Sequence, residues 1–341
     1  MKKHNIIGDF GETAIIKIIE SVIHEITGKI LIQDDSFFFA LPPNKDNKMV
    51  AVFNSDMLVS TTDIPPQMDF HQIGRKSVIM NISDLIVKNV KPRAMIISMG
   101  LPKDLYIKNF KDIIRGIVEC SRKYDLDYIG GDINETKEII INPTIFGYQE
   151  DSKIIHREGI NEGDVIVANG KFGLTGVGFD ILLNKKGDIS QYPSYKRSIM
   201  SVLEPVDFKG EAFILGDKNL ASASIDSSDG LAKSLKELIS SNSKIGFEIN
   251  FNEELMDEEA VRYSKEFNIS LKDLIFNAGE EFIHLFTIPN EDILNASKII
   301  RDNHMELFRI GRVISDEKIY IIEKSQKKGL TFSGFEHFKN N

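Results

Sequence analysis

The chain begins with apolar residues at helical spacing. In residues 11–28 apolar side chains recur three and four positions apart, and Gly28 ends the pattern. Such spacing places the apolar residues on one face of a helix. The members of this stripe are Ile15, Ile16, Ile19, Val22, Ile23 and Ile26. The sequence therefore predicts an amphipathic helix that ends at Gly28.

Strand and helix patterns then alternate up to about residue 150. Short runs rich in β-branched and aromatic residues predict strands. These runs are 36–41, 49–54, 93–100, 127–131 and 138–148. Apolar residues at helical spacing predict two long helices, at 71–90 and 104–124, and Pro92 follows the first of them. The alternation indicates an α/β or α+β fold.

A polar stretch at residues 149–164 separates this set from a second one. Strands are predicted at 164–170, 221–225, 245–250, 281–288, 307–314 and 318–323. Helices are predicted at 174–183, 195–203, 208–217, 231–239 and 291–302, with two more helical stretches between 251 and 280. We therefore expect two domains, comprising residues 1–150 and 151–341.

Composition and charge limit the classes of protein to which the chain can belong. Its 341 residues are 42% hydrophobic and 27% charged, which is typical of a folded globular protein. The net charge is −9 and the basic residues are scattered, which argues against a nucleic-acid-binding surface. Phosphorylated small molecules are compatible with this charge because bound divalent cations invert the local sign.

Neither a membrane span nor a secretory signal is evident. No segment approaches the roughly 18 apolar residues of a membrane span, and the first residues lack the apolar core of a signal peptide. A cytoplasmic protein is therefore expected. The single cysteine, Cys120, excludes an internal disulfide, and the amphipathic helix around it favours a buried structural thiol over a catalytic one.

Five acidic clusters stand at predicted strand ends or inside apolar segments. They are Gln33-Asp34-Asp35-Ser36, Asn54-Ser55-Asp56, Asn81-Ile82-Ser83-Asp84, Gly130-Gly131-Asp132 and Asp226-Ser227-Ser228-Asp229. Carboxylate, hydroxyl and amide oxygens are hard ligands, which Mg²⁺ takes together with water and phosphate oxygens. Asp84 is the most informative member because it lies in an apolar helix, where an unpaired buried carboxylate is costly.

Each cluster also has a purely structural interpretation. The pair Asp34-Asp35 could belong to a loop or cap a helix, and Asp56 and Asp132 could be turn residues after strands. Asp226 and Asp229 could cap the helix predicted at 231–239. Taken singly, these alternatives are reasonable; together they require five independent coincidences.

Other common sites do not match the sequence. The glycines of residues 165–180 lack the G-x-G-x-x-G spacing of a dinucleotide site, and no G-x-x-x-x-G-K-[ST] segment is present. The sequence also has no H-E-x-x-H or G-x-S-x-G motif. The seven histidines show no metal-ligand spacing and are interpreted as surface or packing residues.

The order of the acidic clusters resembles that of the thiamine-monophosphate kinase family. This family shares an ATP-binding superfamily with aminoimidazole ribonucleotide synthetase, selenophosphate synthetase and the hydrogenase-maturation dehydratase. Eight short matches span nearly the whole chain in the same order. They are Gly11-Glu12, Asp34-Asp35-Ser36, Ser55-Asp56-Met57-Leu58-Val59, Asn81-Ile82-Ser83-Asp84-Leu85, Gly130-Gly131-Asp132, Asp226-Ser227-Ser228-Asp229-Gly230-Leu231, Gly279-Glu280-Glu281 and Gly334-Phe335-Glu336-His337-Phe338.

The resemblance implies ATP- and Mg²⁺-dependent phosphorylation of thiamine monophosphate to thiamine diphosphate. The implied ligands of several Mg²⁺ ions are Asp35, Asn54, Ser55, Asp56, Asp84, Asp132, Asp226 and Asp229. The implied ATP contacts are Gly131, Asp132, Arg157 and Ser228, and the implied thiamine contacts are Asp63, Glu280 and Phe335. It also implies an N-terminal α/β domain whose mixed sheet pairs in a homodimer, and a C-terminal α+β domain that completes the nucleotide and substrate site.

Departures from the family pattern concentrate at the acceptor end. Asn54-Ser55-Asp56 stands where the family has S-T-D, Asp63 replaces a histidine, and Ala278-Gly279-Glu280-Glu281-Phe282 replaces G-G-E-D-Y. A related ATP-dependent kinase or ligase acting on another phosphorylated acceptor is therefore an alternative. A nucleotide-binding regulatory protein without catalysis is a second alternative, which the retained aspartates and Arg157 disfavour.

The charges of the two implied substrates indicate the mechanism. ATP and a phosphate monoester repel each other, so positioning and charge neutralisation dominate the transfer. The acceptor phosphate is already ionised near neutral pH, because its second pKa is about 6. We therefore expect direct in-line transfer without a general base and without distinct catalytic residues beyond the metal ligands.

Overall fold

The computed structural model describes residues 12–28, 30, 34–42, 48–205, 208–336 and 338. Three residues of the sequence motifs, Gly11, Gln33 and His337, lie outside these ranges, as do residues 43–47 of the loop between the first two predicted strands. No helix in the described part of the chain combines the length and apolar character that crossing a membrane requires.

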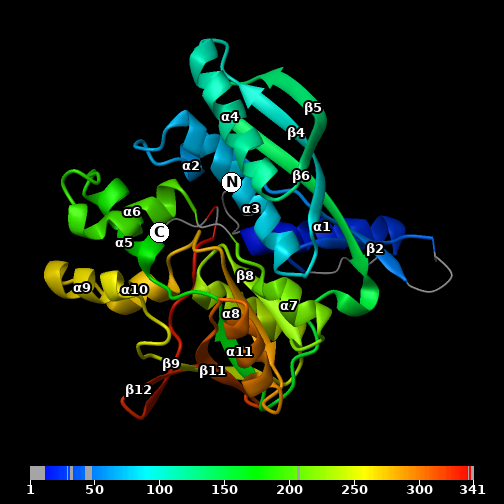
Figure 1. Ribbon diagram of the computed structural model, residues 1–341, viewed down its shortest axis with the longest axis vertical. Coiled ribbons are helices and arrows are strands. Elements are labelled where there is room, and N and C mark those ends of the chain that lie inside the picture. Colours follow the sequence, from blue (N-terminus) through cyan, green and yellow to red (C-terminus); the bar gives the residue numbers. More distant parts are fainter. Residues whose placement is uncertain are drawn as a thin grey trace, which may run out of the picture.

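Strands from the first 150 residues form one six-stranded mixed sheet (Figure 1). Its order is β1-β2-β6-β4-β5, and the short β3 also pairs with β6. The parallel pair is β4 with β5, and the remaining pairs are antiparallel. The strands are β1 (Phe37–Ala40), β2 (Met49–Asn54), β3 (Leu58–Val59), β4 (Pro92–Leu101), β5 (Asp127–Glu135) and β6 (Ile140–Glu150).

Two long helices, α3 (Phe70–Ile86) and α4 (Ile107–Lys123), pack together against one face of this sheet. Glycines let their backbones approach closely. A Cβ atom on Gly116 of α4 would lie 2.0 Å from the carbonyl oxygen of His71, and one on Gly74 of α3 would lie 2.0 Å from that of Ile113. Side chains cannot occupy such gaps, so both glycines are required for the helix contact.

The opposite face of the first sheet is open in this chain. Along β4, Ile97 and Met99 are buried against the helices, whereas Ile96 and Ser98 alternate with them and are exposed. The β5 residue paired with Ser98 is Asp132, so its side chain also belongs to the open face. Large apolar side chains exposed on this sheet include Phe37, Phe39, Phe53 and Ile96. We call this surface the open face.

The second half of the chain forms a seven-stranded sheet with the order β13-β12-β9-β11-β7-β10-β8. Its strands are β7 (Val165–Ala168), β8 (Ala223–Ser227), β9 (Gly246–Asn250), β10 (Ile283–Ile288), β11 (Phe308–Ile314), β12 (Ile319–Glu323) and β13 (Gln326–Gly329). The edge strand β8 lies next to α3 of the first half. This contact brings the acidic segment of α3, residues 81–84, next to the acidic segment that begins in β8, residues 226–229.

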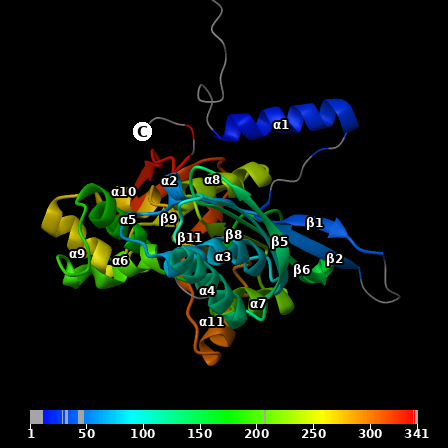
Figure 2. The same ribbon diagram turned by 90° about the horizontal axis from the view of Figure 1, so that it is seen from above.

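The remaining elements are helices, most of which belong to the second half of the chain. They are α5 (Leu174–Phe179), α6 (Lys196–Leu203), α7 (Glu211–Asp217), α8 (Leu231–Ser241), α9 (Glu258–Phe267), α10 (Leu271–Phe276) and α11 (Ile293–Asp302). In the first half, α2 (Ser60–Asp63) precedes α3, and α1 (Glu12–Thr27) extends along one side of the molecule (Figure 2). Several apolar residues of α1 are exposed, among them Ile19 and Ile26.

Element types follow the sequence predictions closely, and the differences are local. The helix predicted at 71–90 ends at Ile86, because Asn89 adopts a left-handed conformation with φ +62°. The strand predicted at 127–131 continues to Glu135, so Asp132 lies inside β5 rather than at its end. The helix predicted at 174–183 becomes α5 followed by a π-helical turn, Asp180–Asn184. The short β3, α2 and β13 have no counterpart among the predictions.

The contact between α3 and α4 generates a prediction with a defined sign. In an isolated helix, Gly116→Ala would add about 1 kcal/mol of stability through helix propensity. Here the new methyl group would collide with the backbone of α3, so the free energy of unfolding should fall by about 1–3 kcal/mol. Urea unfolding measures the difference. Gly329→Ala, which meets open space, is the matched control and should change stability little; stabilisation by Gly116→Ala would contradict the packing.

Candidate active site

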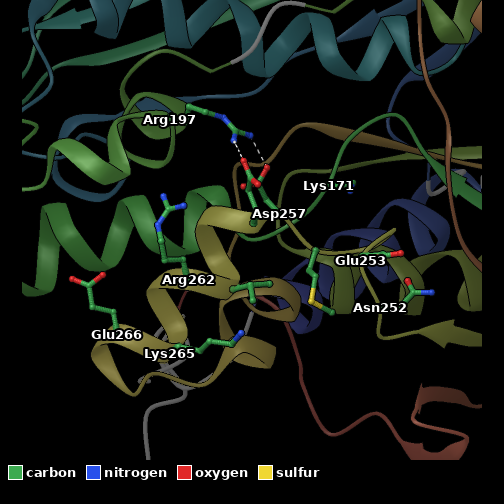
Figure 3. Close-up of a pocket in the computed structure, with 11 residues that line it drawn as sticks. Lys171, Arg197, Asn252, Glu253, Asp257, Arg262, Lys265 and Glu266 are labelled. Carbon is green, nitrogen blue, oxygen red and sulfur yellow. Dashed lines mark hydrogen bonds and ion pairs between the residues drawn. The ribbon is translucent and has the colours of Figure 1, made fainter.

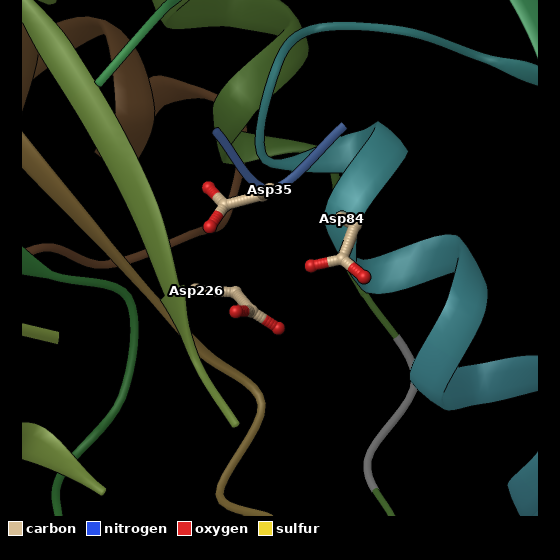
Figure 4. Close-up of side chains that lie close together, drawn as sticks. All are labelled: Asp35, Asp84 and Asp226. Atoms are coloured by element: carbon tan, nitrogen blue, oxygen red, sulfur yellow. The ribbon is translucent and has the colours of Figure 1, made fainter. Parts of the chain in front are cut away.

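Three aspartates from distant parts of the sequence converge between the two halves of the chain (Figure 4). Asp35 precedes β1, Asp84 lies in α3 and Asp226 lies in β8, and all three are buried. A carboxylate oxygen from each lies within 4.8 Å of the others. Buried carboxylates at this separation repel one another unless a cation or protons compensate them. We call these three residues the aspartate cluster.

The electrostatics of the aspartate cluster reflect this missing compensation. Burial raises the pKa of Asp84 well above its usual value, and repulsion from Asp226, Asp56 and Asp35 raises it further. Burial likewise raises the pKa of Asp226 well above the usual range, with repulsion from Asp35 adding to the effect and the hydrogen bond from Ser83 opposing it. The site therefore favours either protonated carboxyls or a bound cation.

One edge of the cluster is already neutralised by basic side chains. The fully buried Lys88 ammonium lies 2.7 Å from Asp34 Oδ1 and 2.7 Å from Asp35 Oδ2, and it donates a hydrogen bond to the carbonyl oxygen of Ser224. Arg157 forms an ion pair with Asp35 and a second one with Glu237. Burial opposes ionisation of Asp34, but Lys88 and its other partners lower its pKa overall. The negative charge without an ion-pair partner therefore resides mainly on Asp84 and Asp226.

Polar residues of α3 hold the surrounding acidic residues in place. The side-chain oxygen of Asn81 accepts a hydrogen bond from the Asp56 backbone N–H at 2.7 Å, and its amide nitrogen donates to the Asp56 carbonyl at 3.0 Å. Ser83 donates to Asp226 Oδ2 at 2.8 Å. The amide nitrogen of Asn54 donates to Asp84, and to Asp56 at 3.3 Å. Helix α3 thus places Asn54 and Asp56 beside the aspartate cluster.

The segment from Asp226 to Leu231 is a strand-to-helix turn, and its aspartates do not cap the helix. Asp226 lies inside β8, and the N-cap of α8 is Gly230, which has no side-chain hydrogen bond. Asp229 accepts instead from Lys233 at 2.6 Å. The helix-cap interpretation of Asp226 and Asp229 is therefore wrong.

The same turn gathers two other predicted residues from the C-terminal part of the chain. The backbone N–H of Glu280 donates to the Ser228 carbonyl at 2.5 Å, and that of Phe335 donates to the Asp229 carbonyl at 2.9 Å. The Glu280 side chain forms an ion pair with Lys76, which also donates to the backbone carbonyl of Asp63. A second group of residues thus lies next to the aspartate cluster; its members are Ser228, Asp229, Glu280, Phe335 and Asp63.

Two predicted regions do not reach the aspartate cluster in this chain. Ser55 is exposed, and its hydroxyl bonds to Asn142 and Thr144 of β6. Asp132 is exposed on the edge strand β5, with Gly131 before it. A Cβ atom on Gly131 would lie 1.9 Å from the Ile97 carbonyl oxygen, so this position accepts only glycine. Ser55 and Asp132 both belong to the open face.

A hollow on the described surface lies elsewhere, beside α9 (Figure 3). It has a volume of about 1000 Å³ and is shallow and open to solvent. Arg197 and Asp257 form an ion pair of 2.6 Å on its wall. Basic and acidic side chains alternate around it, and none of the predicted site residues lines it. The candidate site is therefore identified by its converging carboxylates and not by the volume of a cavity.

Sequence reasoning missed three buried polar residues that complete the site: Lys76, Lys88 and His284. His284 packs face to face on Phe208, with ring centroids 4.8 Å apart, and lies 3.3 Å from the Ser83 hydroxyl. Burial lowers its pKa to about 3, with Lys88 adding to the effect, so the imidazole is neutral. Both lysines belong to the segment 71–90, which the sequence predicts to be a helix with an apolar face, and that was the available signal, because a buried ammonium requires anionic partners.

The raised pKa values of Asp84 and Asp226 predict how stability depends on pH. Below the ordinary aspartate pKa of 3.8 both carboxyls are protonated in the folded and the unfolded chain; above it the unfolded chain releases protons that the folded chain retains. In metal-free buffer the free energy of unfolding should therefore fall as pH rises from about 5 to about 8. Urea unfolding across this range measures the slope.

Excess Mg²⁺ should remove this fall in stability, because a cation stabilises the ionised carboxylates of the folded chain. Asp84→Asn should flatten the metal-free slope, whereas the exposed Asp188→Asn should leave it unchanged in this range. Equal slopes with and without Mg²⁺ in the unmodified protein would contradict the assignment of uncompensated charge to the cluster.

Known proteins resemble this chain over most of its length. Residues 33–149 match the family model described as AIR synthase related protein, N-terminal domain. A thiamine-monophosphate kinase from Nitrosopumilus maritimus is 32% identical over 307 residues, which cover 87% of this chain and 94% of the relative. A second one, from Pyrococcus horikoshii, is 31% identical over 329 residues, which cover 95% of this chain and 96% of the relative.

The fold agrees as well. A solved structure described as AaThiL complexed with AMPPCP and TMP superposes with a TM-score of 0.80 and 22% identity, covering 98% of this chain and all of that one. The acidic motifs converge at the aspartate cluster, and the chain is 31–32% identical to these two kinases over most of its length. The chain belongs to the thiamine-monophosphate kinase family.

Proposed function

We propose that the aspartate cluster and the turn beside it are the active site of an ATP-dependent kinase that converts thiamine monophosphate to thiamine diphosphate. The observation that carries this proposal is the convergence of Asp35, Asp84 and Asp226 next to the turn that contacts Glu280 and Phe335. One end of the site is rich in carboxylates and the other ends in an aromatic ring. The related structure that holds AMPPCP and TMP supports the same pair of substrates.

The cluster fits Mg²⁺ through its ligand chemistry and its charge. All three side chains offer carboxylate oxygens, and the raised pKa values of Asp84 and Asp226 indicate that these two carboxyls lack positive charge beside them. Asp35, Asp84 and Asp226 would hold the metal, with Asp56 and Asn54 beside them and Asp229 at the neighbouring turn. Bound Mg²⁺ would neutralise charge on the phosphates and bring them together.

Arg157 is the protein's own cation at the nucleotide end. It is partly buried and forms ion pairs with Asp35 and Glu237, which fix its guanidinium. A fixed guanidinium supplies several directed donors to phosphate oxygens. We assign Arg157 to ATP on this basis, and we assign Ser228 to ATP because the family resemblance implies it.

Residues at the other end suit a flat, cationic acceptor. Glu280 is partly buried; burial raises the pKa of its carboxyl, the ion pair with Lys76 opposes this shift, and nearby Asp63 and Asp229 add to it. Phe335 is partly exposed and attached to the Asp229 carbonyl. An aromatic face and carboxylates together attract a positively charged ring through stacking and cation–π interactions. The side chain of Asp63 accepts from the Val59 backbone, so we propose that it shapes the acceptor pocket rather than contacting substrate through a free carboxylate.

Direct in-line transfer follows from these charges. The acceptor phosphate is ionised near neutral pH, so the site requires no general base. His284 contacts Ser83 but is buried and neutral, and its low pKa makes it a poor proton acceptor. The chain's own residues therefore orient two anions and exclude water rather than transfer protons.

We further propose that the protein is a homodimer formed through the open face. This surface exposes Phe37, Phe39, Phe53 and Ile96 without cover from the described residues of the chain. Contiguous exposed apolar surface of this kind marks an interaction site. The open face also carries Asp132, which lies outside the aspartate cluster of its own chain. In a dimer, Gly131 and Asp132 would complete the nucleotide site of the second copy.

The separation of the chain into two sheets supports a domain boundary near residue 150, as the sequence predicted. We propose that residues 1–150 bind metal and ATP, and that residues 151–341 complete the nucleotide and acceptor sites. A cytoplasmic location remains a prediction.

The proposed activity is tested by a product assay. Purified protein with ATP, Mg²⁺ and thiamine monophosphate is expected to form thiamine diphosphate and ADP. Asp84→Asn, and also Asp132→Asn, should lower kcat by about 100-fold or more with the fold retained, because each removes charge from the site. Asp188→Asn is the matched control and should keep the rate of the unmodified enzyme.

The same assay separates this activity from its alternative. A panel of other phosphorylated acceptors, followed by ADP release, tests whether Asp63 and the segment 278–282 change the acceptor. ADP formation with another acceptor and none with thiamine monophosphate would overturn the proposed substrate.

The proposed dimer is tested by light scattering after gel filtration. The unmodified protein is expected to have twice the mass of the chain, and Ile96→Glu should yield a monomer because it places charge in the open face. Leu294→Glu, at an exposed position of α11, should leave the mass unchanged. A monomeric unmodified protein would rule out this interface.

A further inference from the structure

Lys76 of α3 is a buried lysine to which neither the family motifs nor the chemistry described above assigns a role. Its side chain is 1% exposed. Its ammonium lies 2.7 Å from Glu280 Oε1 and donates a hydrogen bond to the Asp63 carbonyl oxygen. Desolvating an ammonium is costly, so a lysine at this depth is retained only with strong anionic partners. Lys76 thus contacts two of the three predicted acceptor residues, Asp63 and Glu280.

Glu280 is held in an unusual state. It is not glycine, yet its backbone adopts a left-handed conformation with φ +59°. Its N–H donates to the Ser228 carbonyl oxygen at 2.5 Å, which fixes the backbone against the turn after β8. Its Oε1 atom contacts Lys76, while Oε2 is buried and has no hydrogen-bond partner among the described residues. An unpaired buried carboxylate oxygen is costly, which points to a ligand donor as its partner.

The position of Lys76 also links the two ends of the site. Lys76 and Asp84 belong to the same helix, eight positions apart, which is about 12 Å along the axis of a regular helix. The helix is rigidly packed, since the residues around both positions are buried. Helix α3 therefore helps to set the place of the Glu280 carboxylate relative to the aspartate cluster, together with the backbone hydrogen bond from Glu280 to Ser228.

We propose that Lys76 is a positioning residue for the acceptor, which holds Glu280 so that its Oε2 faces a hydrogen-bond donor or positive charge on the acceptor's ring system. This inference rests on the proposed function. Lys76 acts through Glu280 and does not touch the reacting phosphates. It also reduces the summed negative charge of Glu280, Asp63 and Asp229, so that the pocket keeps one directed carboxylate oxygen for the acceptor.

The test is steady-state kinetics of Lys76→Met, which keeps the length of the side chain and removes its charge. The KM for thiamine monophosphate is expected to rise about tenfold or more, while the KM for ATP stays within about twofold. A merely structural role would change both constants or neither. Lys272→Met is the matched control, because Lys272 forms a 2.7 Å ion pair with Glu323, which is not among the predicted site residues; it should leave both constants unchanged.

A double-mutant comparison keeps the proposal testable if Lys76→Met folds poorly. The single variant Glu280→Gln is compared with the double variant Glu280→Gln/Lys76→Met. Both lack the carboxylate charge that Lys76 is proposed to hold. The double variant should fold better than Lys76→Met alone, because removing both members of a buried ion pair is better tolerated than removing one. Equal acceptor KM values for Glu280→Gln and the double variant support the proposal, because Lys76 then has nothing left to position. A further loss in the double variant overturns it.

The two proposals fail in different ways. An unmodified enzyme that forms no thiamine diphosphate overturns the proposed function itself. An active unmodified enzyme whose acceptor KM is unaffected by Lys76→Met overturns only the role of Lys76.

Discussion

Electrostatic repulsion among buried carboxylates determines how the elements around the site must be arranged. Asp35, Asp84 and Asp226 come from a loop, a helix and a strand, and the fold brings them within 4.8 Å of one another. Such an arrangement costs free energy that the surrounding structure must supply. The close packing of α3 on α4 and the contact of α3 with β8 provide the rigid frame. A bound cation then gains affinity from the repulsion it relieves.

The positive charges are not distributed evenly among the carboxylates of the site. Lys88 and Arg157 neutralise the side near Asp34 and Asp35, which leaves Asp84 and Asp226 as the strongest attractors of a cation. Lys76 plays the corresponding part at the acceptor end, where it faces Glu280. Helix α3 carries Lys76 and Asp84, and Lys88 follows in the turn just after it, so one element fixes the spacing between the metal and acceptor ends.

Much of this could be predicted from the sequence, and the limits have physical causes. Periodicity gave the helices and strands because a buried face needs apolar residues at regular spacing, and the acidic motifs identified the members of the cluster. Pair contacts between distant segments leave no such periodic signal, so the partners of Lys76 and Lys88 became visible only in three dimensions. Asp132 illustrates the same limit: its motif was recognisable, but its place on the open face depends on the register of β5 against β4.

We propose that the aspartate cluster binds divalent cations together with the nucleotide. The most direct test is a crystal structure with Mn²⁺ and a non-hydrolysable ATP analogue, in which anomalous scattering locates the metal. Mn²⁺ is expected to bind carboxylate oxygens of Asp84 and Asp226, with the nucleotide phosphates adjacent and Arg157 facing them. Nucleotide-bound Mn²⁺ located away from these carboxylates, with the aspartate cluster empty, would contradict this proposal.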